Sequence, residues 1–369
     1  MKTTTIAAVV HEKDAPFVLE EVELDEPRSN EVLVRMVATG LCHTDLSVRS
    51  GVIPFPLPAV LGHEGAGIVE RVGSAVQRVR PGDHVLASFT SCGACVNCVT
   101  GSPSNCDHFF PMNLLGGTRP DGTYTIHQDG LPLNAHFFGQ STLAERALID
   151  ERSLVKVDES APLALLAPLG CGIQTGAGAV LNVLRPEPGS TLVVFGVGAV
   201  GLSAIMAAAL TGAAHIVAVD VVPSRLELAM ELGATDTIDA RSIDVKEALM
   251  EMSGGRGVDY TIESSGNLEA ASNAVQLLAA RGTCALIGAP PAGATVPVDV
   301  IFMHLGRKVV GVAEGNSVPE VFLPALVRLY ELGKLPLERL VRHYPFAQIE
   351  QAAADAKAGV TIKPVLVFD

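Results

Sequence analysis

The most constraining feature of this 369-residue sequence is a glycine-rich turn with a predicted strand before it and a predicted helix after it. Residues 191–195 are a continuous apolar run, and residues 200–210 have the apolar spacing of a helix. Between them stands Gly196-Val197-Gly198-Ala199-Val200-Gly201, and the next predicted strand, 215–219, ends in Asp220. This order is typical of a doubly wound parallel sheet that binds a dinucleotide.

Each glycine of the turn has its own steric role. Gly196 permits the tight turn, Gly198 lets the backbone approach a pyrophosphate, and Gly201 lets the helix pack on the strand. The helix N-terminus presents free N–H groups to the phosphates. Asp220 is placed to accept hydrogen bonds from a ribose 2′-hydroxyl and to repel a 2′-phosphate, which favours NAD over NADP. The alternative is a similar sheet without a dinucleotide, as in S-adenosylmethionine binders or scaffold domains.

Strands and helices continue to alternate after this turn. We expect a helix at 224–232 and strands at 237–238, 258–262, 283–287 and 309–312, with further helices between them. Residues 1 to about 160 instead carry short apolar runs broken by glycine and proline, such as 31–38, 67–72 and 84–88, and the tail ends in a strand-like run, 364–368. These runs predict a mostly antiparallel, barrel-like β domain beside the α/β domain.

The composition narrows the classes of protein to consider. Hydrophobic residues make up 48% and charged residues 18%, which is ordinary for a globular chain. The net charge of −14 repels phosphate backbones, so we expect no nucleic-acid partner. We see neither a membrane span nor a signal peptide, and therefore expect a cytoplasmic protein without a membrane partner. In that reducing compartment the seven cysteines are metal ligands or thiols rather than disulfides.

Four cysteines stand within one short, loop-like segment. Cys92, Cys95, Cys98 and Cys106 form C-x2-C-x2-C-x7-C, with glycines and a proline among them. Four thiolates this close have no explanation as apolar core, and four sulfur ligands without an open position suit a structural zinc. An iron–sulfur cluster is the chemical alternative, and a pair of disulfides is a third that needs an oxidising compartment.

Further motifs run along the chain: Gly40-Leu41-Cys42-His43-Thr44-Asp45, Gly62-His63-Glu64-Gly65-Ala66-Gly67, Pro81-Gly82-Asp83-His84-Val85 and Gly170-Cys171-Gly172. Together with the four-cysteine loop and the glycine-rich turn, they resemble the zinc-containing medium-chain alcohol dehydrogenases over the whole chain. Within that family, the string PLGCGIQTG at 168–176 looks most like the aryl-alcohol, or benzyl alcohol, dehydrogenases.

The resemblance implies a second, catalytic zinc site, which spacing alone does not reveal. Its ligands are Cys42, His63 and Cys171, and they leave a fourth position for water or the alcohol oxygen. Glu64 and Asp45 orient the ligands from outside the coordination sphere.

The resemblance also implies groups for proton transfer and cofactor binding. Thr44 takes the proton from the alcohol. Ser47 stands where one branch of the family has a histidine, so the proton follows a longer path to solvent. The implied cofactor contacts are His43 and Lys363 at the pyrophosphate, Arg225 near the adenosine, and Thr175, Val200, Ile287 and Gly288 around the nicotinamide.

Three phenylalanines stand where the family places substrate-pocket residues. Phe89 precedes the four-cysteine loop, and Phe137 and Phe138 follow a glycine-rich stretch. An aromatic wall favours an aromatic or allylic alcohol. Ordinary core packing is the alternative explanation for all three rings.

These expectations combine into one predicted architecture. A GroES-like β-barrel catalytic domain, residues 1–173 and 312–369, holds both zinc sites, and a Rossmann domain, residues 174–311, binds NAD. The active site is expected in the cleft between them, as pockets often lie between domains. The predicted assembly is a homodimer or a homotetramer.

The predicted reaction is the reversible oxidation of a small primary alcohol, aromatic or allylic, to its aldehyde. A general or a glutathione-dependent (S-hydroxymethylglutathione) alcohol dehydrogenase of the same family is the alternative. The three zinc ligands exclude a zinc-free quinone reductase. A non-catalytic, dinucleotide-sensing protein is disfavoured because Cys42, His63 and Thr44 are all present.

We predict that NAD is strongly preferred over NADP. A buried carboxylate at Asp220 that faces a 2′-phosphate costs a few kcal/mol, which corresponds to roughly a hundredfold in kcat/KM. Steady-state kinetics with both cofactors measure the ratio, and equal values would contradict the role of Asp220.

Overall fold

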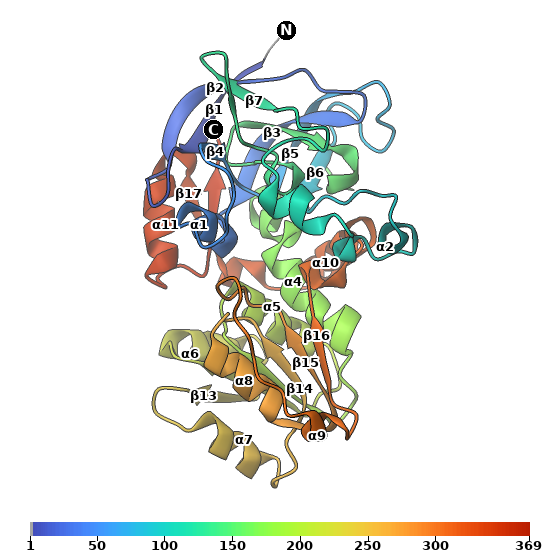
Figure 1. Ribbon diagram of the computed structural model, residues 1–369, viewed down its shortest axis with the longest axis vertical. Helices are drawn as coiled ribbons and strands as arrows, with labels where there is room; N and C mark the ends of the chain where they lie inside the picture. The colour runs from blue at the N-terminus through green and yellow to red at the C-terminus, as the bar shows by residue number, and fades with distance from the viewer. Residues whose placement is uncertain (1–2) are drawn as a thin grey trace. The chain divides into compact units, whose positions relative to one another are not determined.

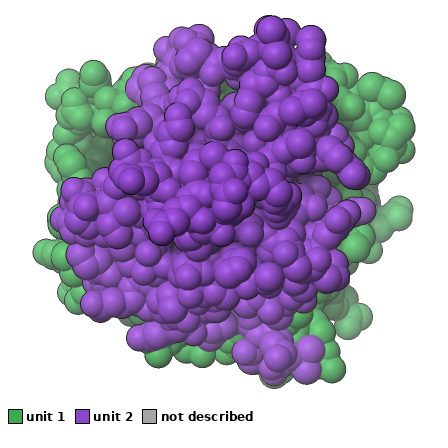
Figure 2. Space-filling view, turned by 90° about the horizontal axis from the view of Figure 1, so that it is seen from below, with its two compact units in different colours: residues 1–171, 318–330, 337–369 green, residues 172–317, 331–336 purple. Residues whose placement is uncertain are grey.

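The structure, a computed structural model, describes residues 3–369 and falls into two compact units, coloured green and purple in Figure 2. The first unit runs to Cys171 and also contains Val318–Tyr330 and Leu337–Asp369. The second contains Gly172–Ser317 and Glu331–Pro336. We expected the boundaries after residues 173 and 311, whereas residues 172–173, 312–317 and 331–336 also belong to the second unit.

The first unit is built on β-strands: β1 (Thr3–Val10), β2 (Val18–Leu24), β3 (Glu31–Gly40), β4 (Ala59–Val60), β5 (Gly65–Val72), β6 (His84–Ala87), β7 (Ile126–Gln128), β8 (Leu131–Leu133), β9 (Arg146–Asp150), β10 (Leu154–Val157), β17 (Val341–Pro345) and β18 (Lys363–Val367). One sheet has the order β4-β1-β2-β7-β8, and the other β10-β6-β5-β3-β18-β17 with β9 paired to β3. Apart from the parallel pair β17–β18, the paired strands are antiparallel.

Side-chain alternation explains how these strands divide between core and surface. In β2, Val22 and Leu24 are buried while Glu21 is exposed, the period-two pattern of a strand with one wet face. β3 pairs with β5, β9 and β18, and nearly its whole length is buried. The helices of this unit are α1 (His43–Arg49), α2 (Val96–Val99), α3 (Leu163–Leu166) and α11 (Ile349–Lys357), while α10 (Pro319–Glu331) ends at the border of the second unit.

The second unit is a parallel sheet with helices, as the glycine-rich turn predicts (Figure 1). Its strands are β11 (Thr191–Phe195), β12 (His215–Asp220), β13 (Asp236–Asp239), β14 (Val258–Glu263), β15 (Leu278–Leu286) and β16 (Lys308–Gly311), in the order β13-β12-β11-β14-β15-β16. Its helices are α4 (Gly172–Gly178), α5 (Ala199–Ala208), α6 (Pro223–Glu231), α7 (Val245–Met252), α8 (Leu268–Gln276) and α9 (Val300–Met303). The expected fold class, a β unit plus a doubly wound parallel unit, is confirmed.

The register of the parallel sheet positions a binding edge. Phe195 pairs with Val219 on one side and with Glu263 on the other, and Glu263 pairs with Leu286. Because the strands are parallel, the loops that follow β11, β12, β14 and β15 all leave the sheet at this edge. Ligands of such sheets bind at the carboxyl ends of the strands.

No helix within residues 3–369 is by itself both long enough and apolar enough to cross a bilayer. One broken pair, Leu163–Gly170 with Gly172–Leu184, reaches that length and composition together, and most of its residues are buried in the protein.

A buried ion pair joins two segments of the first unit. The Arg119 guanidinium donates to both oxygens of Glu31 at 2.6 and 3.0 Å and to Asp25 at 3.0 Å. Arg119 is only 3% exposed and Glu31 only 5%. A pair this deeply buried leaves an uncompensated charge when one partner is removed.

We therefore predict that Arg119→Met lowers the free energy of unfolding by about 3–5 kcal/mol. The matched control is Arg146→Met, because Arg146 forms a comparable two-pronged pair with Glu70 at a half-buried position. Its loss is expected to cost about 1 kcal/mol or less. Urea denaturation of both variants measures the difference, and equal losses would contradict the assigned importance of burial.

Candidate active site

The structure brings together three side chains that stand far apart in the sequence. Cys42 caps α1, His63 lies between β4 and β5, and Cys171 follows a short 3-10 helix at 167–170. Their ligand atoms, together with a carboxylate oxygen of Glu64, all lie within 4.8 Å of one another. All four residues belong to the first unit.

His63 is held ready to bind a metal. Its ring is fully buried, and Nδ1 lies 3.2 Å from the Asp45 carboxylate. Nδ1–H therefore donates to Asp45, which leaves the lone pair on Nε2. Nε2 is buried and has no hydrogen-bond partner among the described residues. An imidazole nitrogen free in this way, beside two cysteine sulfurs that form no disulfide, fits a zinc ion with one open coordination position.

The Cys42 thiol is tuned by its neighbours. Hydrogen bonding with Cys171 and the positive charge of Lys363 hold its pKa well below the usual range, although burial opposes the shift. A thiolate is the form that binds a metal. The Thr44 hydroxyl lies 3.6 Å from the Cys42 sulfur, so the group expected to accept the alcohol proton stands beside the ligand set.

Lys363 forms a buried ion pair that the sequence did not indicate. The residue is 3% exposed, and its ammonium donates to both oxygens of Glu64, at 2.8 and 3.0 Å. Lys363 is thus the buried counter-ion of Glu64, and its expected contact with the cofactor pyrophosphate stays a prediction. The two residues are 299 positions apart, so no local pattern in the sequence could reveal the pair.

The three expected pocket phenylalanines lie in one aromatic cluster against His63. The Phe138 ring stacks on the His63 ring with centroids 4.4 Å apart, and Phe137 meets the same ring edge-on at 5.3 Å. Phe89 joins through Phe109, which contacts both Phe89 and Phe138. Phe137 has no exposed surface, and Phe89 and Phe138 are 3% and 4% exposed. Phe137 is therefore a core support of the cluster.

Other members of the site had no sequence signal. The buried Gln140 side chain donates to the backbone carbonyls of His63 at 3.0 Å and Ser88 at 2.8 Å, and the Ser88 hydroxyl donates to that of Gly170. These bonds link the segments that carry two of the ligands. His43 is exposed at the start of α1, and Ser47 lies within the same helix.

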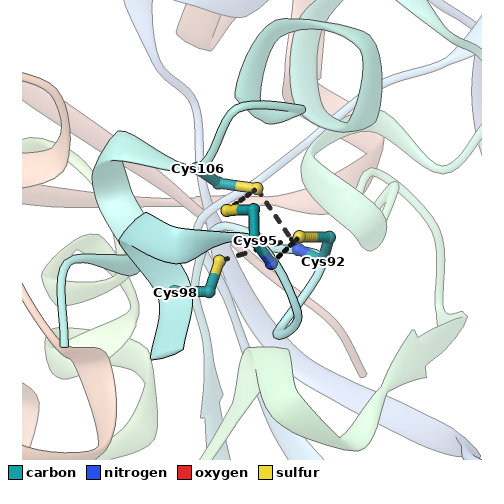
Figure 3. Close-up of side chains that lie close together, drawn as sticks. All are labelled: Cys92, Cys95, Cys98 and Cys106. Atoms are coloured by element: carbon teal, nitrogen blue, oxygen red, sulfur yellow. Dashed lines mark hydrogen bonds between the residues drawn. The ribbon is translucent and has the colours of Figure 1, made fainter. Parts of the chain in front are cut away.

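The four clustered cysteines form a separate centre (Figure 3). Their sulfurs lie within 4.8 Å of one another, with 3.9 Å between Cys92 and Cys98 and between Cys95 and Cys106. Tetrahedral zinc with Zn–S bonds of about 2.3 Å places its sulfurs about 3.8 Å apart, so one ion fits. Amides of Ala94 and Cys95 point at the Cys92 sulfur and lower its pKa to about 6. All seven cysteines, which lie within the described residues, are free of disulfides.

The close packing around the glycine-rich turn agrees with the steric roles expected of Gly196 and Gly201. Gly196 has φ 82°, and a Cβ on Gly201 would lie 2.0 Å from the Gly196 carbonyl oxygen. A Cβ on Gly198 would meet nothing within 4 Å, so that position is open to a ligand. Gly198 is also the N-cap of α5, whose first amides face the same space.

Asp220 has a structural role that the sequence did not indicate. It is 8% exposed and accepts hydrogen bonds from the amides of Val197, Val221 and Val222, and so ties the end of β12 to the glycine-rich turn. It lines a cavity of about 460 Å³ together with Gly196. The other expected cofactor residues, Arg225, Thr175, Val200, Ile287 and Gly288, lie in this unit outside that cavity's lining.

We predict two zinc ions per chain with separable effects. Cys95→Ser removes a ligand of the four-cysteine centre and is expected to lower the melting temperature markedly, because structural zinc contributes folding free energy. Cys171→Ser is expected to abolish activity with a smaller loss of stability. Elemental analysis and thermal denaturation of both variants test this, and one zinc or less in fully active native protein would refute it.

Comparison with known proteins agrees with this geometry. Residues 28–159 match the alcohol dehydrogenase GroES-like domain, and residues 199–330 match the zinc-binding dehydrogenase domain. Geraniol dehydrogenase of Castellaniella defragrans is 41% identical, over 98% of this chain and 97% of its own length. An alcohol dehydrogenase zinc-binding domain protein of Burkholderia ambifaria (49% identity, TM-score 0.97) and benzyl alcohol dehydrogenase of Acinetobacter calcoaceticus (46%, 0.95) match over the full length of both chains. With both domains matched, the chain belongs to the zinc-containing medium-chain alcohol dehydrogenase family.

Proposed function

We propose that this dehydrogenase uses NAD to oxidise primary aromatic or allylic alcohols, reversibly, to their aldehydes. The observation that carries the substrate class is the Phe138 ring stacked on the His63 ring at 4.4 Å. It puts an aromatic ring directly beside a metal ligand. We propose that an aromatic or conjugated substrate packs on the part of the Phe138 ring that His63 does not cover, which gains about 1.5–3 kcal/mol over a methyl group.

The relatives support the same class. Geraniol is an allylic primary alcohol and benzyl alcohol is an aromatic one, and the dehydrogenases named for them are 41% and 46% identical to this chain. Both substrates carry the hydroxyl on a carbon next to an unsaturated group, and this shared feature is the one we assign to the substrate of this protein.

The residues of the first unit supply the zinc site and the proton path. Cys42, His63 and Cys171 would hold the catalytic zinc, and zinc bound there lowers the pKa of an alcohol hydroxyl. Thr44, beside Cys42, accepts the hydroxyl proton. Asp45 keeps the His63 ring in one orientation, and Glu64, which lies close to the three ligand atoms, is paired with Lys363. Ser47 cannot pass the proton on as an imidazole does, so we propose release through water.

The second unit supplies the cofactor site. The open position at Gly198, the free amides that begin α5 and the carboxylate of Asp220 suit the pyrophosphate and ribose of NAD. His43, Arg225, Thr175, Val200, Ile287 and Gly288 stay our proposed contacts for the rest of the cofactor. We further propose a cytoplasmic homodimer or homotetramer.

A direct assay tests the proposed reaction. Purified protein is mixed with NAD and benzyl alcohol, cinnamyl alcohol, geraniol or ethanol, and NADH absorbance is followed. We expect turnover of the first three alcohols with kcat/KM well above that for ethanol, and without glutathione. Activity restricted to formaldehyde with glutathione would favour the S-hydroxymethylglutathione alternative, and a preference for ethanol would favour a general alcohol dehydrogenase.

The aromatic wall makes a sharper prediction. Phe138→Ala is expected to raise KM for benzyl alcohol by roughly tenfold or more, from the loss of about 1.5–3 kcal/mol of packing, while KM for ethanol changes little. Phe346→Ala is the control, because Phe346 is a buried ring of the same unit that packs on Phe368 instead. If both substrates lose affinity equally in Phe138→Ala, the aromatic assignment is wrong.

A further inference from the structure

The second unit contains a buried acid to which the proposed reaction gives no role. Glu263 is the last residue of β14 and is 2% exposed. Its backbone lies in the sheet between Phe195, which precedes the glycine-rich turn, and Leu286, which precedes Ile287 and Gly288. Glu263 thus stands between two segments assigned to the cofactor.

The Glu263 side chain holds the turn that follows it. Its Oε1 accepts hydrogen bonds from the Ser265 amide at 2.7 Å, the Gly266 amide at 2.9 Å and the Ser265 hydroxyl at 2.5 Å. Three donors on one buried oxygen fix the turn 264–266 against the strand. Without that acceptor, the donors lose their partner and the turn can relax.

This turn is packed against the glycine-rich turn. The Ser264 hydroxyl donates to the Gly196 carbonyl at 2.7 Å. A Cβ on Gly196 would lie 2.7 Å from the Cβ of Ser265, so the two turns already touch. The position of residues 264–266 therefore limits where the predicted pyrophosphate turn can lie.

The same turn also contacts the predicted nicotinamide segment. The Glu263 carbonyl accepts the amides of Ile287 at 2.8 Å and Gly288 at 3.0 Å. A Cβ on Gly288 would lie 2.2 Å from the Gly266 nitrogen and 2.5 Å from Glu263 Oε2. A side chain at position 288 would therefore collide with Glu263 and with the turn 264–266.

We propose that Glu263 is a positioning residue for the dinucleotide: its carboxylate fixes the turn 264–266, which in turn sets the distance between the Gly196 turn and the Ile287–Gly288 segment. The inference rests on the proposed use of NAD. In this role Glu263 affects the affinity for the cofactor but does not touch the reacting alcohol or the zinc ligands. The zinc ligands belong to the first unit.

The role requires an acceptor oxygen rather than a negative charge. Burial raises the pKa of Glu263, and the hydrogen bonds from Ser265 and Gly266 oppose that shift. The carbonyl oxygen of a glutamine can accept the same three hydrogen bonds. Glu263→Gln therefore removes the charge and keeps the acceptor oxygen, whereas Glu263→Ala removes both.

The experiment is a fluorescence titration of NADH with the zinc-loaded protein. The chain has no tryptophan, so the emission of bound NADH is read without that background. We expect Glu263→Ala to weaken NADH binding about tenfold or more, and Glu263→Gln to stay within about threefold of the native value. Zinc content stays at the native level in both. The control is Asp158→Ala in the first unit. Asp158 accepts hydrogen bonds from the amide and the hydroxyl of Ser160, as Glu263 does from those of Ser265.

A second variant covers the case in which Glu263→Ala does not fold. Gly288→Ala keeps the acid but forces the same contact apart, and we expect a similar loss of NADH affinity. Native-like affinity in the folded Glu263→Ala or Gly288→Ala variant overturns the inference. An equal loss in Glu263→Gln and Glu263→Ala overturns it too, because charge would then matter. Failure of the native protein to bind NADH would instead refute the proposed cofactor.

Discussion

The catalytic site depends on one fully buried carboxylate. Asp45 accepts the amides of Cys42 and Gly62 and the Nδ1–H of His63. One side chain therefore fixes the backbone of one ligand, the backbone beside another ligand, and the orientation and tautomer of an imidazole. Without Asp45, nothing would hold His63 Nε2 toward the sulfurs of Cys42 and Cys171, and the three ligands would not share a common centre.

In the second unit, steric contacts between glycines and neighbouring backbone fix the positions of the loops. Gly196, Gly201 and Gly288 stand where any side chain would collide with neighbouring backbone, so the loops at the carboxyl edge of the sheet approach one another closely. Asp220 and Glu263 then hold these loops through backbone amides. The glycines and the buried acids thus have complementary roles at this edge of the sheet. The glycines allow the loops to come into contact, and the acids keep that contact in one geometry.

Much of this could be predicted from the sequence, and the limits have physical causes. The strand 191–195 and its turn were predictable because one local motif contains the strand, the steric requirement and the helix start. The four-cysteine centre was predictable because its ligands are neighbours in the chain. The Glu64–Lys363 pair and the Gln140 bonds were not, because each joins residues that only the folded sheets bring together, and a lone lysine or glutamine has no periodic signal. The complete burial of Phe137, which was expected to line the substrate pocket, was not predictable either, since burial depends on packing that its position in the chain does not encode.

The placement of β18 has a consequence for the order in which the protein is made. Lys363, on this strand, neutralises Glu64, and β18 completes its sheet by pairing with β3 near the start of the chain. The whole parallel unit is synthesised between these two strands. A nascent chain therefore contains the complete sequence of the second unit while Glu64 still lacks its counter-ion and β3 still lacks its β18 partner. During translation the zinc-ligand region gains these two contacts only after the second unit has been synthesised.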